Sequence, residues 1–493
     1  MEHSSNRMHI PEHGTPGQEL LATIDQYKAE DINWKEGRAW SLVYYLNEEH
    51  LALLQKAHER FFSESTLNPI AFKSIKKMEQ QVVEMTAQLL NGGPNAVGTM
   101  TSGGTESLFL MLFTYRERAR KEQPHITSPE IVMPLSAHPA IEKAAHILGI
   151  KIRKAKLDKK QRVIPASIEK QINENTILLV SSAPAYPHGV LDPIEQVGAI
   201  AQKHNLPLHI DACIGGFMLP WLRKLGYPIP HWNFEVPGVT SISADAHKFA
   251  FGSKGSSVLV YRNMDFLKYQ FYVSTEWPGG VYGSTTLLGT RSGGPVATAW
   301  TAMQALGEAG YLKMAKELME GAEKIRKTLR QIPEIEIVGQ GVMNIVAFTT
   351  KNNKPDIFVI GEQLEDKGWL VDRQQKPSCI HLTVMPQNVP IIDEYLHDLQ
   401  VALAYAKANP KATAKGKAAM YGLMARIPFR GLVEDNVRQF FVDMYKSAAN
   451  TSKEVVHSVE QAPEEISKFM GSLNRILSKG AGLKSKLKHF FSK

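Results

Sequence analysis

Short apolar runs alternate with helical patterns through the middle of this 493-residue chain, and this alternation constrains its fold more than any other feature. Helical spacing of apolar residues is clear in segments such as Glu106–Lys121 and Pro193–His204. The apolar runs predict strands at Glu130–Met133, Lys151–Lys156, Thr176–Ser181, Pro207–Ile210, Ser241–Ala244 and Ser256–Tyr261. Such alternation is typical of an α/β protein with a mostly parallel sheet covered on both faces. Ligands of these sheets bind at the carboxyl ends of the strands.

The chain is expected to have four regions. An N-terminal arm spans residues 1–60, and a large domain built on the sheet spans 61–311. A smaller α+β domain spans 312–430, and a helical tail spans 431–493. In the small domain the pattern predicts a long helix at Leu312–Gln331, followed by strands at Ile335–Phe348, Trp369–Val371 and Ile380–Val384 and helices at Ile357–Lys367 and Ile392–Lys407.

Composition narrows the class of protein. Hydrophobic residues make up 43 % and charged residues 22 %, which is a globular profile. Two cysteines do not make a disulfide framework. The sequence shows neither a signal peptide nor an apolar run long enough to span a bilayer. A cytoplasmic, soluble protein is therefore expected, and the sequence leaves open peripheral membrane association and export to a host cell.

The net charge of +8 is concentrated at one end of the chain. Residues 471–493 contain six lysines and arginines and no acidic residue, so the rest of the chain is nearly balanced and no nucleic-acid partner is expected. Apolar residues recur between these cations at three- and four-residue spacing. This pattern fits a basic amphipathic helix on an anionic membrane. It equally fits a helix that packs on the body of the protein.

Two strand ends carry unusual polar residues. Lys248 follows His247 at the end of one apolar run, and Asp211 ends another. Burial is expected to lower the pKa of such a lysine and make its amine a nucleophile. A buried carboxylate needs a cationic partner, such as a protonated pyridine nitrogen. Taken alone, the lysine could reach solvent and the aspartate could cap a turn.

Two earlier loops fit the same chemistry. Gly104 and Thr105 lie in a Gly-Gly-Thr sequence before an apolar helix, where free backbone amides can hold a phosphate. His138 follows a strand and could stack on a planar ring. As single features, Thr105 could be a helix cap and His138 an ordinary loop residue. No metal site is expected.

The order of these motifs resembles that of fold-type I pyridoxal phosphate enzymes. More closely, the chain is similar to the sphingosine-1-phosphate lyase family of the group II decarboxylase-like branch. The resemblance covers about Gly37 to Met424 and rests on Asn91–Pro94, Thr101–Ser107, Ser136–His138, Pro187–Val190, His209–Cys213, Gly238–Asp245, His247–Lys248, Lys254–Ser257, Gly279–Tyr282, Gly289–Arg291 and Gly293–Gly294. It implies a seven-stranded, mostly parallel sheet domain that binds pyridoxal 5'-phosphate and a small C-terminal domain.

The resemblance also implies roles for individual residues. Lys248 would bond to the cofactor, Asp211 would pair with its ring nitrogen, and His138 would stack on the ring. Gly104, Thr105 and His247 would lie at the cofactor, and Lys254 and Tyr44 would contact the substrate phosphate or take part in catalysis. Ser284, Thr286 and Arg291 would complete the pocket from a second subunit of a homodimer with shared active sites. One departure stands out, because Ala71 occupies the position of a family histidine.

The expected activity is pyridoxal phosphate-dependent retro-aldol cleavage. The C2–C3 bond of sphingosine 1-phosphate, or of another phosphorylated sphingoid base, would break to give a fatty aldehyde and phosphoethanolamine. The nearest alternative is a pyridoxal phosphate-dependent amino-acid decarboxylase. An alternative of another class is a noncatalytic scaffold that binds a lipid or a protein.

Overall fold

The computed structural model describes residues 9–410, 412 and 430–446. The chain divides into two compact units. Among the described residues, one comprises Asn33–Lys351 and Ile380–His397, and the other comprises residues 9–32, 352–379, 398–410, 412 and 430–446. The domain boundaries expected near residues 60, 311 and 430 stay predictions. The basic segment 471–493 lies outside the described residues.

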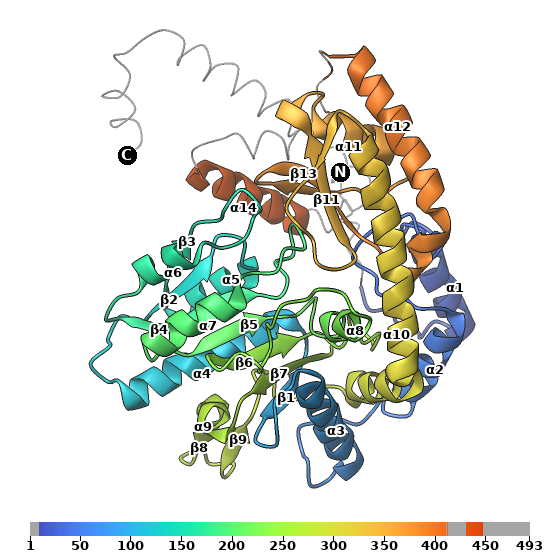
Figure 1. The fold of residues 1–493 in the computed structure, drawn as a ribbon. Coiled ribbons are helices and arrows are strands. Elements are labelled where there is room, and N and C mark those ends of the chain that lie inside the picture. Colours follow the sequence, from blue (N-terminus) through green and yellow to red (C-terminus); the bar gives the residue numbers. More distant parts are fainter. Residues whose placement is uncertain (1–8, 411, 413–429, 447–493) are drawn as a thin grey trace, which may run out of the picture. The chain divides into compact units, whose positions relative to one another are not determined.

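A seven-stranded sheet forms the centre of the first unit, with the order β1-β7-β6-β5-β4-β2-β3 (Figure 1). Neighbouring strands from β3 to β6 are parallel, whereas β7 is antiparallel to both β6 and β1. This confirms the predicted mostly parallel sheet of seven strands. The strands are β1 Val97–Thr101, β2 Glu130–Pro134, β3 Lys151–Ala155, β4 Thr176–Ser182, β5 Leu208–Asp211, β6 Val239–Ala244 and β7 Ser257–Tyr261. Strand β1 had no counterpart in the sequence prediction.

Helices connect these strands and bury the sheet. Side chains of α4 and α5 pack with Ile131 and Met133 of β2, whereas Val132 between them is buried outside this cluster. Because successive strand residues face opposite sides, β2 is buried on both faces. This double burial explains why the strands read as continuous apolar runs. The connecting helices are α4 Gly104–Glu122, α5 Pro139–Leu148, α6 Pro165–Gln171, α7 Ile194–Lys203 and α8 Leu219–Lys224, and α9 Met264–Leu267 follows the last strand, β7.

Three further helices of this unit lie together: α2 Glu48–Glu59, α3 Lys73–Leu89 and α10 Gly293–Gln331. The sequence predicts separate helices at Gly294–Gly307 and Leu312–Gln331. The structure has the continuous element α10, but Gly307 inside it has φ 54° and ψ −179°. That conformation is accessible almost only to glycine, so the predicted break is a local interruption rather than a loop.

The second sheet corrects two sequence predictions. Its order is β10-β11-β13-β12, with β10 Ile335–Ile337, β11 Ile345–Thr350, β12 Asp372–Gln375 and β13 Ser378–Thr383. The single strand expected at Ile335–Phe348 is two antiparallel strands, β10 and β11. The strand expected at Trp369–Val371 is wrong, because β12 begins only at Asp372. Trp369 is buried, and its indole N–H donates to Asp398 over 2.9 Å.

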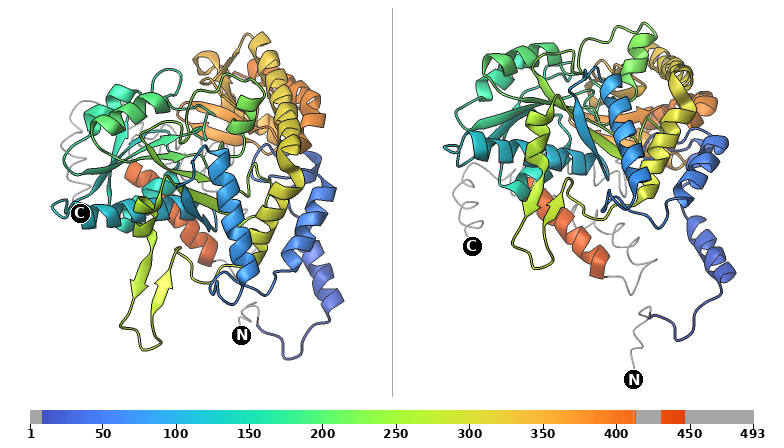
Figure 2. Two further views of the ribbon diagram at one scale, coloured as in Figure 1. Left: turned by 60° about the horizontal axis from the view of Figure 1, so that its bottom comes forward. Right: turned by 90° about the horizontal axis from the view of Figure 1, so that it is seen from below.

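The remaining elements are α1 Gly17–Lys28, α11 Ile357–Glu365, α12 Ile392–Ala408, α14 Arg430–Lys446 and the hairpin of β8 Tyr272–Ser274 and β9 Tyr282–Ser284. The hairpin extends away from the seven-stranded sheet in both views of Figure 2. Within the part of the chain that the structure describes, no helix combines the length and the apolar character needed to cross a membrane.

Candidate active site

A cavity of about 450 Å³ opens at the carboxyl ends of β4, β5 and β6. Parallel strands deliver their last residues to the same edge of a sheet, so segments distant in sequence meet there. The cavity brings together eight of the residues predicted from sequence: Tyr44, Gly104, Thr105, His138, Asp211, His247, Lys248 and Lys254.

Lys248 forms an ion pair that the sequence analysis had missed. Its Nζ lies 2.8 Å from Oδ2 of Asp245, which directly follows β6 and is only 2 % exposed. Asp245 lies three residues before Lys248, and this Asp-x-x-Lys spacing was a signal available in the sequence. His247 Nε2 lies 3.6 Å from the same oxygen. Asp245 is therefore the central carboxylate of a small charged cluster.

This ion pair overturns the expected pKa of Lys248. Burial alone would lower the pKa of the lysine, but the Asp245 carboxylate outweighs burial and raises the pKa above its ordinary value. Burial would likewise raise the pKa of Asp245, yet Lys248 and His247 hold it below its usual range. Without a cofactor, Lys248 is thus an ammonium group rather than a ready nucleophile.

Asp211 lies beside this pair at the end of β5. Its Oδ1 accepts a hydrogen bond from the backbone N–H of Cys213 over 3.1 Å. Burial, Asp211 and Asp245 raise the pKa of the Cys213 thiol, so this cysteine stays neutral. The carboxylates of Asp211 and Asp245 therefore both line the cavity, from the ends of adjacent strands. Asp211 accepts from the N–H of Cys213, whereas Asp245 pairs with Lys248.

The start of α4 forms a backbone cradle next to these carboxylates. Its cap residue, Gly103, has φ 153°, and no side chain caps the helix. Gly104 has no room for a side chain, because a Cβ would lie 2.9 Å from Asp245 Oδ2 and 3.0 Å from Cys213 Sγ. Uncapped amides at a helix N-terminus bind anions well. Thr105 and His138 are exposed and line the same cavity.

We predict that Gly104→Ala weakens binding of pyridoxal phosphate about tenfold or more, because an added methyl group costs about 1–3 kcal/mol in a space already filled. A cofactor titration followed by absorbance measures the effect. Gly17→Ala is the matched control, since a Cβ at Gly17 meets no atom within 4 Å. Unchanged affinity in Gly104→Ala would contradict the cradle.

Lys254 and Tyr44 lie next to each other in the wall of the cavity. Lys254 Nζ donates to the carbonyl oxygen of Leu42 over 2.9 Å and lies 5.0 Å from the centroid of the Tyr44 ring. Partial burial of the ammonium group, together with Lys248, lowers the pKa of Lys254. Burial raises the pKa of Tyr44 to about 12, so its hydroxyl stays protonated. The sequence placed both residues at the site, and the structure brings them into contact.

A strained turn follows Lys248. Phe251 has φ 57°, a left-handed conformation that is rare for a bulky residue. Its N–H donates to the carbonyl of Lys248 over 3.0 Å, and its own carbonyl is 3.0 Å from Nε2 of His50. The turn thereby fixes Lys248 relative to α2, which carries His50.

Three predicted residues do not line this cavity. Ser284 and Thr286 lie at the end of the exposed β8–β9 hairpin, and their hydroxyls donate to the backbone carbonyls of Thr286 and Leu288. Arg291 is instead paired with Glu79, with 2.8 Å between Nη2 and Oε1. Ala71 is exposed in a short loop, where its N–H donates to the side chain of Asn68.

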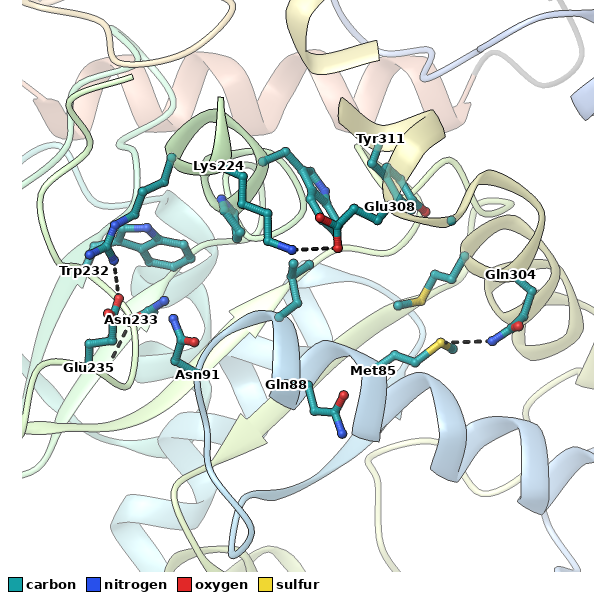
Figure 3. Close-up of a pocket in the computed structure, with 16 residues that line it drawn as sticks. Met85, Gln88, Asn91, Lys224, Trp232, Asn233, Glu235, Gln304, Glu308 and Tyr311 are labelled. Atoms are coloured by element: carbon teal, nitrogen blue, oxygen red, sulfur yellow. Dashed lines mark hydrogen bonds and ion pairs between the residues drawn. The ribbon is translucent and has the colours of Figure 1, made fainter. Parts of the chain in front are cut away.

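A larger hollow of about 730 Å³ lies elsewhere, between α3, α8 and α10, and Figure 3 shows its wall. None of the predicted site residues line it. Its charged groups are paired with each other, as in the Lys224–Glu308 bridge of 2.7 Å. The chemically distinctive side chains are therefore gathered in the smaller cavity.

The residues of that cavity fit pyridoxal phosphate. Lys248 can bond to an aldehyde, the start of α4 can hold a phosphate, and the carboxylates can face a protonated ring nitrogen. Three polar atoms of the lining residues, the Ser182 hydroxyl, Asp245 Oδ1 and His247 Nδ1, are buried without a hydrogen bond among the described residues. They are therefore available to polar atoms of a bound cofactor. The family model of the "Pyridoxal-dependent decarboxylase conserved domain" matches residues 65–351. The fold, the residues of the site and the match to this family model together identify the chain as a pyridoxal phosphate-dependent enzyme of fold type I.

Comparisons with individual proteins show which family of these pyridoxal phosphate-dependent enzymes the chain belongs to. The chain is 40 % identical to the sphingosine-1-phosphate lyase of rice over 89 % of this chain and 82 % of that protein. It is 37 % identical to sphingosine-1-phosphate lyase 1 of the rat over 89 % of this chain and 77 % of that protein. The solved structure of a Burkholderia pseudomallei sphingosine-1-phosphate lyase matches with a TM-score of 0.78 and 37 % identity, covering 82 % of this chain and 94 % of that one. The chain belongs to the sphingosine-1-phosphate lyase family.

Proposed function

We propose that this protein cleaves the C2–C3 bond of phosphorylated sphingoid bases to a fatty aldehyde and phosphoethanolamine. The observation that carries the proposal is the meeting of Lys248, two carboxylates and the exposed Lys254 in one cavity. The relatives named as sphingosine-1-phosphate lyases support the substrate. Lys254 adds a cation for the substrate phosphate, which a simple amino-acid decarboxylase does not require.

When bound, pyridoxal phosphate supplies a sink for the electrons released as the C2–C3 bond breaks. In this proposal the start of α4, with Gly104 and Thr105, holds its phosphate, Asp211 keeps its ring nitrogen protonated, and His138 covers its ring. Lys248 holds the cofactor between turnovers. Asp245 is the positioning residue for Lys248.

Proton transfer at two atoms completes the reaction. The hydroxyl on C3 loses its proton, C3 becomes the aldehyde carbon, and C2 gains a proton. We assign the proton for C2 to Lys248, because Asp245 keeps the released lysine as an ammonium group. His247 is a base next to this pair, and burial lowers its pKa, so it is neutral and able to accept the hydroxyl proton.

The direct test incubates the full-length holoenzyme with sphingosine phosphate and quantifies both products. We expect fatty aldehyde and phosphoethanolamine in equal amounts, with no carbon dioxide from amino acids. Carbon dioxide release without aldehyde would reject the lyase reaction in favour of a decarboxylase.

We predict that Lys254→Met raises KM for the phosphorylated substrate about 10- to 100-fold, because a hydrogen bond to a charged group contributes about 1.5–3 kcal/mol. Steady-state kinetics measure this, and the cofactor absorbance should be retained. Lys268→Met is the control, since Lys268 pairs with Asp265 outside the cavity. A fall in kcat at unchanged KM would instead make Lys254 a proton-transfer residue.

A second copy of the chain is part of this proposal. The β8–β9 hairpin exposes large apolar side chains, among them Val273, Trp277 and Val281, which are 61 %, 59 % and 77 % exposed. Such a surface is typical of a protein interface. A homodimer would cover it and could bring Ser284 and Thr286 to the partner's site. Peripheral membrane contact through the basic tail rests on sequence alone.

A further inference from the structure

A second cavity of about 290 Å³ adjoins the candidate active site. Tyr44, His247 and Lys254 line both cavities. The second one lies against α2, on the side where the His50 contact to Phe251 joins this helix to the catalytic turn. Because the two cavities share these three wall residues, the second cavity is an extension of the candidate active site rather than a separate pocket.

The wall of this cavity is largely hydrocarbon. It is formed by Trp34, Val43, Leu46, Leu51, Leu54 and Phe251, among others. Leu51 and Leu54 lie three residues apart, so α2 presents them on one face.

Several polar groups in the wall are already paired. The hydroxyls of Ser253 and Thr298 lie 2.6 Å apart, and Asn47 caps α2 by accepting the N–H of His50 over 2.8 Å. An apolar ligand would therefore cost these three groups no hydrogen bond.

We propose that this second cavity receives the hydrocarbon chain of the substrate. The inference rests on the proposed function, because it concerns the apolar part of the same amphiphilic molecule. Lys254 lies at the boundary, where it can meet the phosphate while the chain extends past it toward α2. A polar mouth followed by an apolar interior matches the two halves of a phosphorylated long-chain base.

The volume of the second cavity, about 290 Å³, sets how much of a hydrocarbon chain it can hold. At about 30 Å³ per water-sized group, the cavity holds roughly ten methylene-sized groups. Each methylene that leaves water should tighten binding about fourfold. Affinity should therefore rise steeply with chain length and level off once the cavity is full.

The test measures binding rather than cleavage. Hexyl, decyl and tetradecyl phosphate are titrated into the full-length holoenzyme by calorimetry. Leu51→Trp fills part of the cavity, and Leu53→Trp is the matched control, because Leu53 is 42 % exposed on the same helix and does not line the cavity. Val43→Phe provides a second filling variant if Leu51→Trp does not fold.

In the wild type we expect decyl phosphate to bind much more tightly than hexyl phosphate. A filling variant should weaken decyl phosphate about tenfold and leave hexyl phosphate almost unchanged, whereas Leu53→Trp should behave as wild type. The inference is overturned if a folded filling variant keeps the wild-type dependence on chain length, or if the wild type shows none. If the filling variants act as expected but no aldehyde forms from sphingosine phosphate, the cleavage reaction is rejected and the apolar site stands.

Discussion

Lys248→Ala should abolish aldehyde formation, with a loss of at least about a thousandfold. The variant lacks the side-chain amine that would bond to the cofactor aldehyde, so the cofactor cannot be attached covalently at this position. Borohydride reduction followed by mass spectrometry should find a cofactor adduct on the peptide that contains Lys248 in the wild type and none in the variant.

Lys254→Ala serves as the control, because it removes a lysine from the wall of the same cavity. Its adduct at Lys248 should persist. An adduct that survives in Lys248→Ala, or that maps to Lys254, would disprove the assignment of the cofactor lysine.

Asp245→Asn should make Lys248 reactive at lower pH. The carboxylate 2.8 Å away raises the pKa of the lysine, so a neutral amine appears only at high pH. Without that charge, the lowering effect of burial is opposed more weakly, by Tyr44 and Cys213, and the pKa of Lys248 falls. An opposite charge at this distance is worth about one to three pH units, and the pH midpoint for bonding of added pyridoxal phosphate to the apoprotein should fall by about that much.

The cofactor absorbance at a series of pH values provides this midpoint. The titration also responds to the other groups around Lys248, which are Tyr44, Cys213 and Lys254. The substitution keeps these residues in place but removes the Asp245 charge that acts on each of them. Asp265→Asn is the control, because Asp265 pairs with Lys268 away from the cavity. A midpoint that stays in place would show that Asp245 supports the structure without setting the state of Lys248. Turnover should also fall, since the released lysine would no longer be held as a proton donor.

The sheet could be predicted from sequence because its strands are buried on both faces. Such strands form unbroken apolar runs, and six of the seven were placed within two residues. Strand β1 was missed because Val97–Thr101 is only partly buried and polar at alternate positions. Trp369 was misassigned because its burial comes from a side-chain contact with Asp398, which an apolar pattern cannot distinguish from strand pairing.

The candidate site was predictable wherever a residue ends a strand or begins a helix. Asp211 and Gly104 have this property, Lys248 lies four residues after the end of β6, and the structure brings the three together. Asp245 was overlooked because its importance comes from the ion pair with Lys248, three residues further along the chain. In the sequence alone, it looks like an ordinary polar residue at the end of a strand. The raised pKa of Lys248 follows from that pairing, so it could not be foreseen from burial alone.

The left-handed turn at Phe251 has a consequence for protein engineering. It places Lys248, which we propose as the cofactor lysine, and Phe251, a wall residue of the apolar cavity, on one short, strained segment. Substitutions there would disturb reactivity and substrate preference together. Helix α2 offers a separate route, because Leu51 and Leu54 line only the apolar cavity. Chain-length preference could therefore be redesigned from α2 without altering the chemistry.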